Sequence, residues 1–464
     1  MDYGKEEGRT IRSVDMMIGT ARESEALPKI DMHKRFIITT LAIFAALSLQ
    51  AQTGAWTGKL KVQGTELTLV FDLDKGTLDV PDQGAKDIPA QVSREATGTI
   101  TIEIPSINAS YKGLWLGRAI TGTFTQHGVS FPLMLNPGRP AINRPQTPVG
   151  PFPYTTEDVS FTNGSARLSG TLTLPQDVTA ETPALVMVTG SGLQNRDEEL
   201  FGHKPFAVIA DALARAGIAT LRYDDRGFGE STGDVIYCTT EDLKDDALAG
   251  VTLLRERFER VGVLGHSEGG TIALMLAAQG QADFVISLAG MVVSGAQTLL
   301  EQNRRALTKA GVPESEADAY CSLLGKAFEA AAASEPLPTG EDAALSPALL
   351  QNYSAVCQQL KLPYLRYFAS LDVSKRLAQV TCPVLALNGT KDTQVECSEN
   401  LSALRSGLPA NPHTSIRPVE GLNHLFQHCT TGETDEYGKI EETFSAEVLA
   451  EMISWINSMS PRAD

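Results

Sequence analysis

The stretch that decides the fold runs from Val261 to Gln279 and reads V-G-V-L-G-H-S-E-G-G-T-I-A-L-M-L-A-A-Q. Its apolar beginning predicts a short buried strand, and the residues from Thr271 onward favour a helix. A G-x-S-x-G sequence joins the two, with Ser267 at the apex of a tight turn. Side chains in place of Gly265 or Gly269 would collide with the crossing strand and helix. The stretch therefore predicts a serine nucleophile in a strained turn.

A second G-x-S-x-G match lies at residues 229–233, with Ser231 at its centre. Short patterns of this kind also arise by chance, so the surrounding sequence has to distinguish the two matches. Ser231 follows a polar run, Tyr223 to Gly227, and no helical pattern comes after it. We therefore interpret Ser231 as a loop serine and Ser267 as the candidate nucleophile.

The composition limits the classes of partner. The net charge of −17 argues against binding to nucleic acid or to an anionic membrane surface. The sequence has no C-x-x-C pair and no phosphate-binding G-x-x-x-x-G-K-[ST]. The nearest approach to a dinucleotide fingerprint begins at Gly190 and has Asn195 where the third glycine would stand. We therefore expect a small-molecule substrate and neither a metal nor another cofactor.

The amino-terminal part of the chain has the pattern of a targeting sequence. From Met32 it reads M-H-K-R, followed by an apolar run from Phe36 to Leu49 and then Q-A-Q. This is typical of a secretory signal peptide at 32–51, and the apolar run is too short to span a bilayer comfortably. Residues 1–31 are polar and patternless, which leaves open whether Met1 or Met32 is the true start. We expect an exported protein, periplasmic or secreted, with no stable membrane insertion.

Six cysteines raise the question of disulfide bonds in an exported protein. One hypothesis pairs Cys397 with Cys429, because each follows a candidate site residue by five positions. Free thiols are the alternative. The sequence does not specify an oligomeric state.

Three further segments follow the signal. Residues 52–135 alternate β-branched and polar residues between turn signals, which predicts a small antiparallel all-β domain. Residues 136–156 are rich in proline, which predicts an extended linker without regular structure. From 157 to 464 strands and helices alternate, which predicts an α/β domain with a largely parallel sheet. A stretch at about 291–380 lacks strand signals and is rich in helix formers, so we expect it to be an inserted helical cap.

A serine hydroxyl needs a base, and the base needs an acid to orient it. Asp392 follows the apolar strand Val384 to Leu387, and His424 follows the next predicted strand. Both would lie at the carboxyl ends of parallel strands, where sites of open α/β sheets are found. Rivals remain for both roles. They are Asp372 for the acid and His203 or His428 for the base; His266, as a direct neighbour of the serine, is expected to point away.

A tetrahedral intermediate needs N–H donors for its oxyanion. The backbone N–H of Glu268, directly after the serine, is one expected donor. The other is expected from the glycine-rich loop at 189–193, where we favour Ser191, with Gly192 or Leu193 as alternatives. The Glu268 side chain could favour the helix dipole or recognise a substrate amine.

With these residues assembled, the segment from about 157 to 460 resembles an α/β-hydrolase. It is most similar to the bacterial branch that holds carboxylesterases and serine aminopeptidases. Many relatives have His-Gly before the oxyanion loop, whereas this chain has Thr189-Gly190. The resemblance rests on five motifs in family order: T-G-S-G-L-Q-N-R-D (189–197), Y-D-D-R-G-F-G-E-S (223–231), G-H-S-E-G-G (265–270), N-G-T-K-D (388–392) and G-L-N-H-L-F (421–426).

The leading hypothesis is a serine hydrolase that cleaves carboxylic esters of small or medium acyl groups through an acyl-enzyme. Ser267, His424 and Asp392 would be the catalytic residues, and the N–H groups of Ser191 and Glu268 would hold the oxyanion. One alternative is a proline-directed serine aminopeptidase of the same fold. Another is a non-catalytic binding protein that holds its ligand on the β domain.

Overall fold

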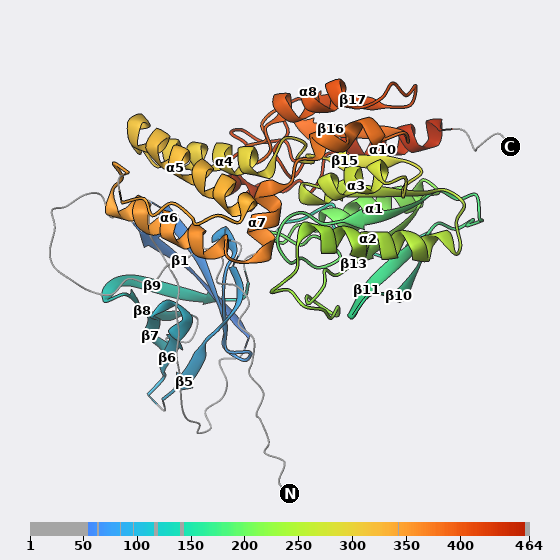
Figure 1. Ribbon diagram of the computed structural model, residues 1–464. Coiled ribbons are helices and arrows are strands. Elements are labelled where there is room, and N and C mark those ends of the chain that lie inside the picture. The colour runs from blue at the N-terminus through green and yellow to red at the C-terminus, as the bar shows by residue number, and fades with distance from the viewer. Residues whose placement is uncertain are drawn as a thin grey trace, which may run out of the picture.

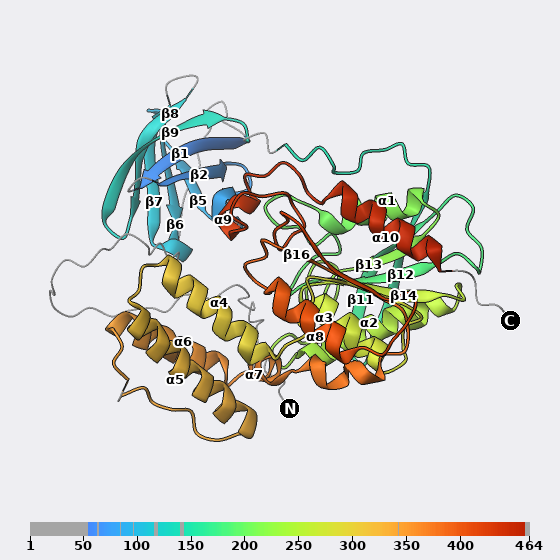
Figure 2. The ribbon, with the colours of Figure 1, turned by 90° about the horizontal axis from the view of Figure 1, so that it is seen from above.

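The computed structural model describes residues 54–459, apart from 63–64, 84, 96, 116–118, 140–142 and 342. The signal peptide expected at 32–51 lies outside these residues. The described chain forms an amino-terminal sheet, a second sheet with helices on both faces, and a group of helices inserted into the second (Figures 1 and 2). Over this described part, no helix is both long enough and apolar enough to cross a bilayer.

The amino-terminal sheet has nine antiparallel strands in the order β4-β3-β2-β1-β9-β8-β7-β6-β5. Alternate residues of each long strand face one core, as Trp56 and Leu60 of β1 do. The all-β prediction is confirmed. The strands are β1 (Ala55–Val62), β2 (Thr65–Asp72), β3 (Thr77–Val80), β4 (Ala85–Pro89), β5 (Gln91–Arg94), β6 (Thr99–Ile104), β7 (Ala109–Trp115), β8 (Ile120–Gln126) and β9 (Val129–Pro137).

The proline-rich segment after β9 is held by side-chain hydrogen bonds to the carboxy-terminal part of the chain. The Arg144 guanidinium donates to the backbone carbonyls of Phe201, Gly438 and Ile440, and also to that of the adjacent Asn143. The Gln146 amide exchanges hydrogen bonds with the Phe444 backbone. Prolines have no N–H to pair, so side chains anchor the segment in place of a backbone ladder.

The second sheet is mixed, with the order β10-β11-β13-β12-β14-β15-β16-β17. The pairs β10–β11 and β11–β13 are antiparallel, and the remaining pairs are parallel. The predicted largely parallel sheet is therefore confirmed. The strands are β10 (Thr155–Asn163), β11 (Ala166–Leu174), β12 (Ala184–Val188), β13 (Ala219–Tyr223), β14 (Val261–His266), β15 (Val285–Leu288), β16 (Val384–Gly389) and β17 (Ser415–Val419).

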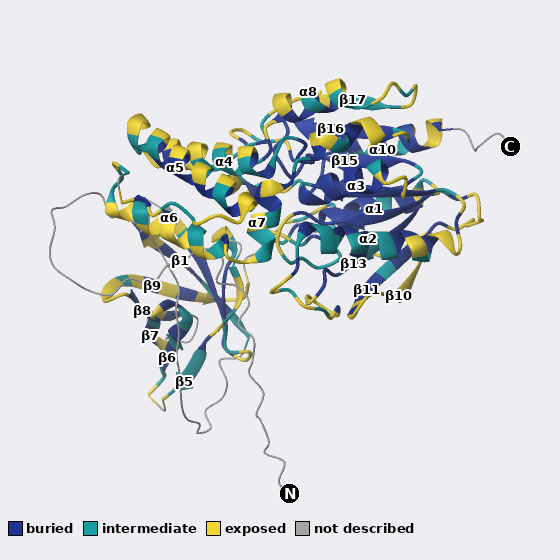
Figure 3. Ribbon diagram, in the orientation of Figure 1, coloured by how far each residue is buried: buried dark blue, intermediate teal, exposed yellow. Residues whose placement is uncertain are grey.

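Helices cover both faces of this sheet, and each face has its own apolar core. One core packs under α2 (Thr240–Arg255), α3 (Glu268–Ala278) and α8 (Cys397–Gly407). The other packs under α1 (Pro205–Arg215) and α10 (Ala446–Ser458). The parallel strands β12, β14, β15 and β16 are consequently buried along their whole length (Figure 3).

A helical cap is inserted between β15 and β16, as the sequence predicts. It consists of α4 (Gly295–Lys309), α5 (Glu314–Ala333), α6 (Pro347–Gln359), α7 (Pro363–Ser370) and the 3₁₀ helix η3 (Val373–Gln379), and most of these helices share a separate apolar core. Two tyrosine hydroxyls of α7 tie the cap to the sheet's helices. Tyr364 donates to Glu268 of α3, and Tyr367 donates to Glu241 of α2.

The turn from β14 to α3 depends on close backbone contact. A Cβ atom on Gly265 would lie 1.9 Å from the Gly269 carbonyl oxygen. A Cβ atom on Gly269 would lie 2.0 Å from the Val188 carbonyl oxygen. Because the neighbouring atoms are backbone and cannot rotate away, both positions exclude every residue but glycine.

We expect Gly265→Ala to lower the free energy of unfolding by at least about 3 kcal/mol, because the added methyl forces β14 and α3 apart. Chemical denaturation measures this change. The matched control is Gly325→Ala within α5, where the nearest atom to a new Cβ lies 3.6 Å away. That substitution should be neutral or stabilise the protein by up to about 1 kcal/mol. Equal stabilities of the two variants would contradict the steric argument.

Candidate active site

Ser267 lies between β14 and α3 in a backbone conformation that L-residues rarely adopt, with φ 54° and ψ −119°. Its N–H donates to the Leu288 carbonyl at 2.8 Å, and its own carbonyl accepts from the N–H of Gly270 at 2.9 Å. These bonds fix the strained turn from both sides, so the half-buried serine stays at the end of the central strand.

Asp392 and His424 meet across the ends of β16 and β17. His424 Nδ1 lies 2.7 Å from Asp392 Oδ2, and both side chains are almost fully buried. The other carboxylate oxygen, Oδ1, accepts from the backbone N–H groups of Gln394 and Val395. With the carboxylate so fixed, Nδ1 carries the proton of the neutral ring, and Nε2 is left as a base.

His424 also lies beside the nucleophile turn. Its carbonyl oxygen is 2.8 Å from Nε2 of His266, the residue before Ser267, and the two imidazole centroids are 4.8 Å apart. Within the described residues no hydrogen bond joins the Ser267 hydroxyl to the His424 ring. Such bonds are often long before substrate arrives, so the arrangement fits a nucleophile and base that align on binding.

The loop after β12 runs directly along the nucleophile. A Cβ on Gly190 would lie 3.1 Å from the Ser267 Cβ. The Gly190 N–H is already used, because it donates to Glu198 Oε1 at 2.8 Å. In the part of the chain that the structure describes, the Ser191 N–H has no acceptor, and Glu268 begins α3, where the N–H has no partner within the helix. These are the two donors that the sequence analysis favours.

The Glu268 side chain is buried and fully engaged. Oε1 accepts from the Thr240 hydroxyl at 2.7 Å, and Oε2 accepts from the Tyr364 hydroxyl of the cap. Burial, together with the Glu268 charge, holds the pKa of Tyr364 well above its usual value, so the phenol keeps its proton. The carboxylate thus joins the cap to the nucleophile helix, which the sequence analysis did not foresee.

Asp225 is a second acid that sequence reasoning missed. Its side chain is buried under the loop after β12, where it accepts hydrogen bonds from the Thr189 hydroxyl and from the Gln194 N–H. Burial raises the pKa of Asp225 to about 8, against the opposing effect of these hydrogen bonds. In the sequence it stands beside Asp224 in a polar run, and no local signal separates the two.

The rival residues occupy structural positions. The Ser231 hydroxyl is buried, donates to the Asp224 carbonyl and accepts from the Ser169 N–H. Asp372 accepts from Ser374 and pairs with Lys375 at the start of η3. The remaining rivals are histidines: His203 is buried against Thr443 and Tyr437, and His428 is exposed and pairs with Glu442.

All six cysteines are free thiols, so the hypothesis of a bond between Cys397 and Cys429 is wrong. The sulfur of Cys397 lies against the Asn388 carbonyl, and that of Cys429 lies against the Gly421 carbonyl. Equal spacing from the site residues does not bring the two sulfurs together, because one lies on α8 and the other lies in the loop after β17.

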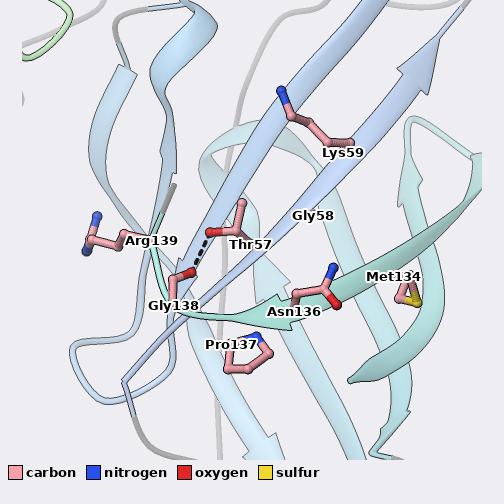
Figure 4. A pocket seen from close by; sticks show the side chains of 8 residues that line it. All are labelled: Thr57, Gly58, Lys59, Met134, Asn136, Pro137, Gly138 and Arg139. Carbon is pink, nitrogen blue, oxygen red and sulfur yellow. Dashed lines mark hydrogen bonds between the residues drawn. The ribbon is translucent and has the colours of Figure 1, made fainter. Parts of the chain in front are cut away.

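A hollow of about 470 Å³ lies on the amino-terminal sheet, away from Ser267 (Figure 4). Residues of β1 and β9 line it, together with Gly138 and Arg139. Arg139 is already paired with Asp72 and Asp79, so its charge is not available to a ligand. Among the described residues, no group of three or more His, Cys, Asp or Glu side chains is placed to hold a metal ion.

Comparisons with known proteins find a matching family and several similar chains. Residues 204–428 match the family described as serine aminopeptidase, S33. Esterase EstD of Thermotoga maritima is 28% identical over 282 residues, which cover 60% of this chain and 61% of EstD. The chain therefore spans about three-fifths of the length of that relative. An uncharacterized 31.7 kDa protein of Escherichia coli is 26% identical over 266 residues, 53% of this chain and 83% of its own length.

The strand order and the nucleophile turn give the carboxy-terminal part of the chain an α/β-hydrolase fold, and the matched segment makes it similar to that family. Among solved structures it is similar to the proline iminopeptidase of Mycobacterium smegmatis, with 18% identity, TM-score 0.40 and coverage of 65% of this chain and 98% of that one. It is also similar to an esterase of Pyrococcus furiosus, with 15% identity, TM-score 0.42 and coverage of 70% and 99%.

We expect Asp392→Asn to slow the reaction of Ser267 with a fluorophosphonate by roughly 10³- to 10⁴-fold, because the amide no longer holds His424 in the tautomer that leaves Nε2 as a base. Mass spectrometry of the labelled peptide over time measures the rate. Asp372→Asn is the matched control and should label at the wild-type rate. A similar loss in both variants would contradict the assignment of Asp392.

Proposed function

We propose that the protein is a serine hydrolase that cleaves carboxylic esters of small or medium acyl groups. Ser267 Oγ attacks the ester carbonyl carbon while His424 Nε2 takes its proton, and the Asp392 carboxylate stabilises the imidazolium. The N–H groups of Ser191 and Glu268 bind the oxyanion. His424 then protonates the leaving alcohol. Water, activated by the same ring, releases the acid and restores Ser267.

The observation that carries this proposal is the 2.7 Å contact between His424 and Asp392, beside a serine held at φ 54°. The backbone N–H groups of Gln394 and Val395 fix one oxygen of the buried Asp392 carboxylate, so that the other is held against His424 Nδ1. The N–H groups of Ser191 and Glu268, which have no acceptor among the described residues, would supply the remaining element of acyl transfer. The similarity to EstD, itself named an esterase, supports the ester as the bond that is cleaved.

A serine aminopeptidase is the second candidate, because that is the description of the matching family. An aminopeptidase has to bind the free ammonium of its substrate, and Glu268 is the acid adjacent to the nucleophile. Both Glu268 oxygens already accept hydrogen bonds from Thr240 and Tyr364, so a substrate amine would have to displace one of them. This favours the esterase.

Export of the protein remains a proposal that rests on the signal-like run after Met32. It agrees with the proposed hydrolysis of small esters, which needs no cofactor from the cytoplasm. Sequencing of the mature amino terminus tests it, because removal of residues up to about 51 is the expected result and an intact Met1 would contradict it.

We expect Ser267→Ala to lower kcat on p-nitrophenyl acetate by roughly 10⁶-fold without loss of the folded state. The assay is spectrophotometric, and circular dichroism monitors the fold. Ser231→Ala is the control from the second G-x-S-x-G sequence. It should lower stability through loss of two buried hydrogen bonds and leave kcat of the folded enzyme near the wild-type value. Full activity of Ser267→Ala would refute the mechanism.

The two candidate activities differ in the bond that is cleaved. We expect kcat/KM for p-nitrophenyl acetate or butyrate to exceed that for proline p-nitroanilide by at least about 100-fold, because both oxygens of Glu268, the acid adjacent to the nucleophile, already accept hydrogen bonds. Parallel assays on one preparation measure the ratio. Faster turnover of the prolyl amide would instead favour the aminopeptidase.

A further inference from the structure

His266 is a buried histidine outside the Asp392–His424 pair, and it contacts the backbone of His424. His266 Nε2 lies 2.8 Å from the carbonyl oxygen of His424, and His266 Nδ1 lies 2.9 Å from Glu198 Oε1. The His266 ring therefore bridges the loop after β12 and the loop after β17. The proposed mechanism assigns no role to His266 or to Glu198.

The two contacts determine the charge of the ring. A backbone carbonyl and a carboxylate oxygen are both acceptors, so each ring nitrogen has to donate a hydrogen. A neutral imidazole has one N–H and can satisfy only one of them, whereas the imidazolium satisfies both. With Glu198 ionised, His266 is a buried cation beside it; their side chains are 8% and 5% exposed.

The surroundings agree with this charge state. Burial alone would lower the pKa of His266, but the Glu198 carboxylate, the His424 carbonyl and the more distant Asp392 charge together raise it above 6.5. The charges of Glu198 and Asp392 and the carbonyl dipole of His424 therefore all favour the protonated ring of His266.

Glu198 also holds the oxyanion loop. The oxygen that faces His266 accepts the Gly190 N–H at 2.8 Å, one residue before the proposed donor Ser191. Glu198 itself has φ 52°, a left-handed backbone conformation that is unfavourable for a residue with a side chain. Strain at this buried position indicates that the surrounding structure requires the carboxylate at this point.

We propose that Glu198 and His266 form a positioning ion pair that sets the His424 backbone and the oxyanion loop relative to Ser267. The inference rests on the proposed function, because it assigns the pair to the geometry of acyl transfer. The negative charge of Glu198 has a second effect. It balances the positive charge of His266, so that a further positive charge can form on His424, whose ring lies 4.8 Å away, during catalysis.

The test is Glu198→Gln, which keeps the shape and an acceptor for Gly190 but removes the charge. His266 then becomes neutral and has to give up one of its two hydrogen bonds. We expect kcat on p-nitrophenyl acetate to fall about 10- to 100-fold with KM changed less than about threefold, because a shift of about 1 Å in the base or oxyanion donors affects the transition state and not substrate binding. His266→Gln should behave in the same way.

The matched control is Asp246→Asn. Asp246 is a buried carboxylate whose hydrogen-bond partners in the described structure are Arg226 and Asn163. Loss of its charge should destabilise the fold to a similar degree, and kcat of the folded enzyme should stay within about threefold of the wild type. Equal losses of kcat in Glu198→Gln and Asp246→Asn would mean that Glu198 only stabilises the fold, which overturns the proposal.

The pH profile separates positioning from stability. As pH rises through the raised pKa of His266, the ring becomes neutral and loses one of its two hydrogen bonds. We therefore expect kcat to decline at alkaline pH. In Glu198→Gln this alkaline decline should begin at lower pH. The stability that the pair contributes is fully present below about pH 6.5 and is lost as pH rises through the folded pKa, so the melting temperatures of the two enzymes should converge at alkaline pH.

A spectroscopic measurement makes the inference independent of turnover. In ¹⁵N-histidine-labelled wild-type enzyme at pH 7, His266 should show two protonated ring nitrogens, and its signals should be absent from His266→Gln. A single protonated nitrogen would overturn the proposal, as would wild-type kcat and an unchanged profile in Glu198→Gln. If the wild type hydrolyses no ester at all, the proposed function fails, and the His266 signals still decide whether the ion pair exists.

Discussion

The crossing of β14 and α3 at Ser267 is the constraint on which the rest of the structure depends. Gly265 and Gly269 bring backbone atoms so close that no side chain fits between strand and helix. This contact forces Ser267 into its strained conformation at the carboxyl end of the central strand. Every other residue of the site is placed relative to that point by strands of the same sheet.

The parallel sheet converts distant sequence positions into neighbours. β14 lies between β12 and β15, so the loop after β12 brings Gly190 and Ser191 beside the serine. The loops after β16 and β17 bring Asp392 and His424 to the same edge. Because parallel strands end at a common edge, a small set of loops can assemble donors, base and acid without moving the core.

Buried acidic side chains surround this edge, and each of them accepts hydrogen bonds. Glu198 faces His266, Glu268 accepts from Thr240 and Tyr364, and Asp225 accepts from Thr189. Each costs desolvation energy, which its hydrogen bonds offset. The network ties the cap, the loop after β12 and the loop that carries His424 to one another. These hydrogen bonds hold the segments around Ser267 in fixed positions relative to one another.

Local sequence patterns determined much of this protein. Three local patterns each indicate the structure of their own segment. They are the glycine spacing around Ser267, the apolar strands before Asp392 and His424, and the run without strand signals that forms the cap. Such features depend on backbone sterics and on hydrophobic periodicity, which are local. The pairing of Asp392 with His424 followed from their order after consecutive strands.

Only the tertiary structure decided the rest. Nothing near Glu198 or Tyr364 in the sequence indicates that one meets His266 and the other meets Glu268, because these contacts join segments 68 and 96 residues apart. The docking of Arg144 on the carboxy-terminal loops and the separation of Cys397 from Cys429 are of the same kind. Burial determines the charge of such groups, and burial is a property of the packed chain, not of any short stretch of it.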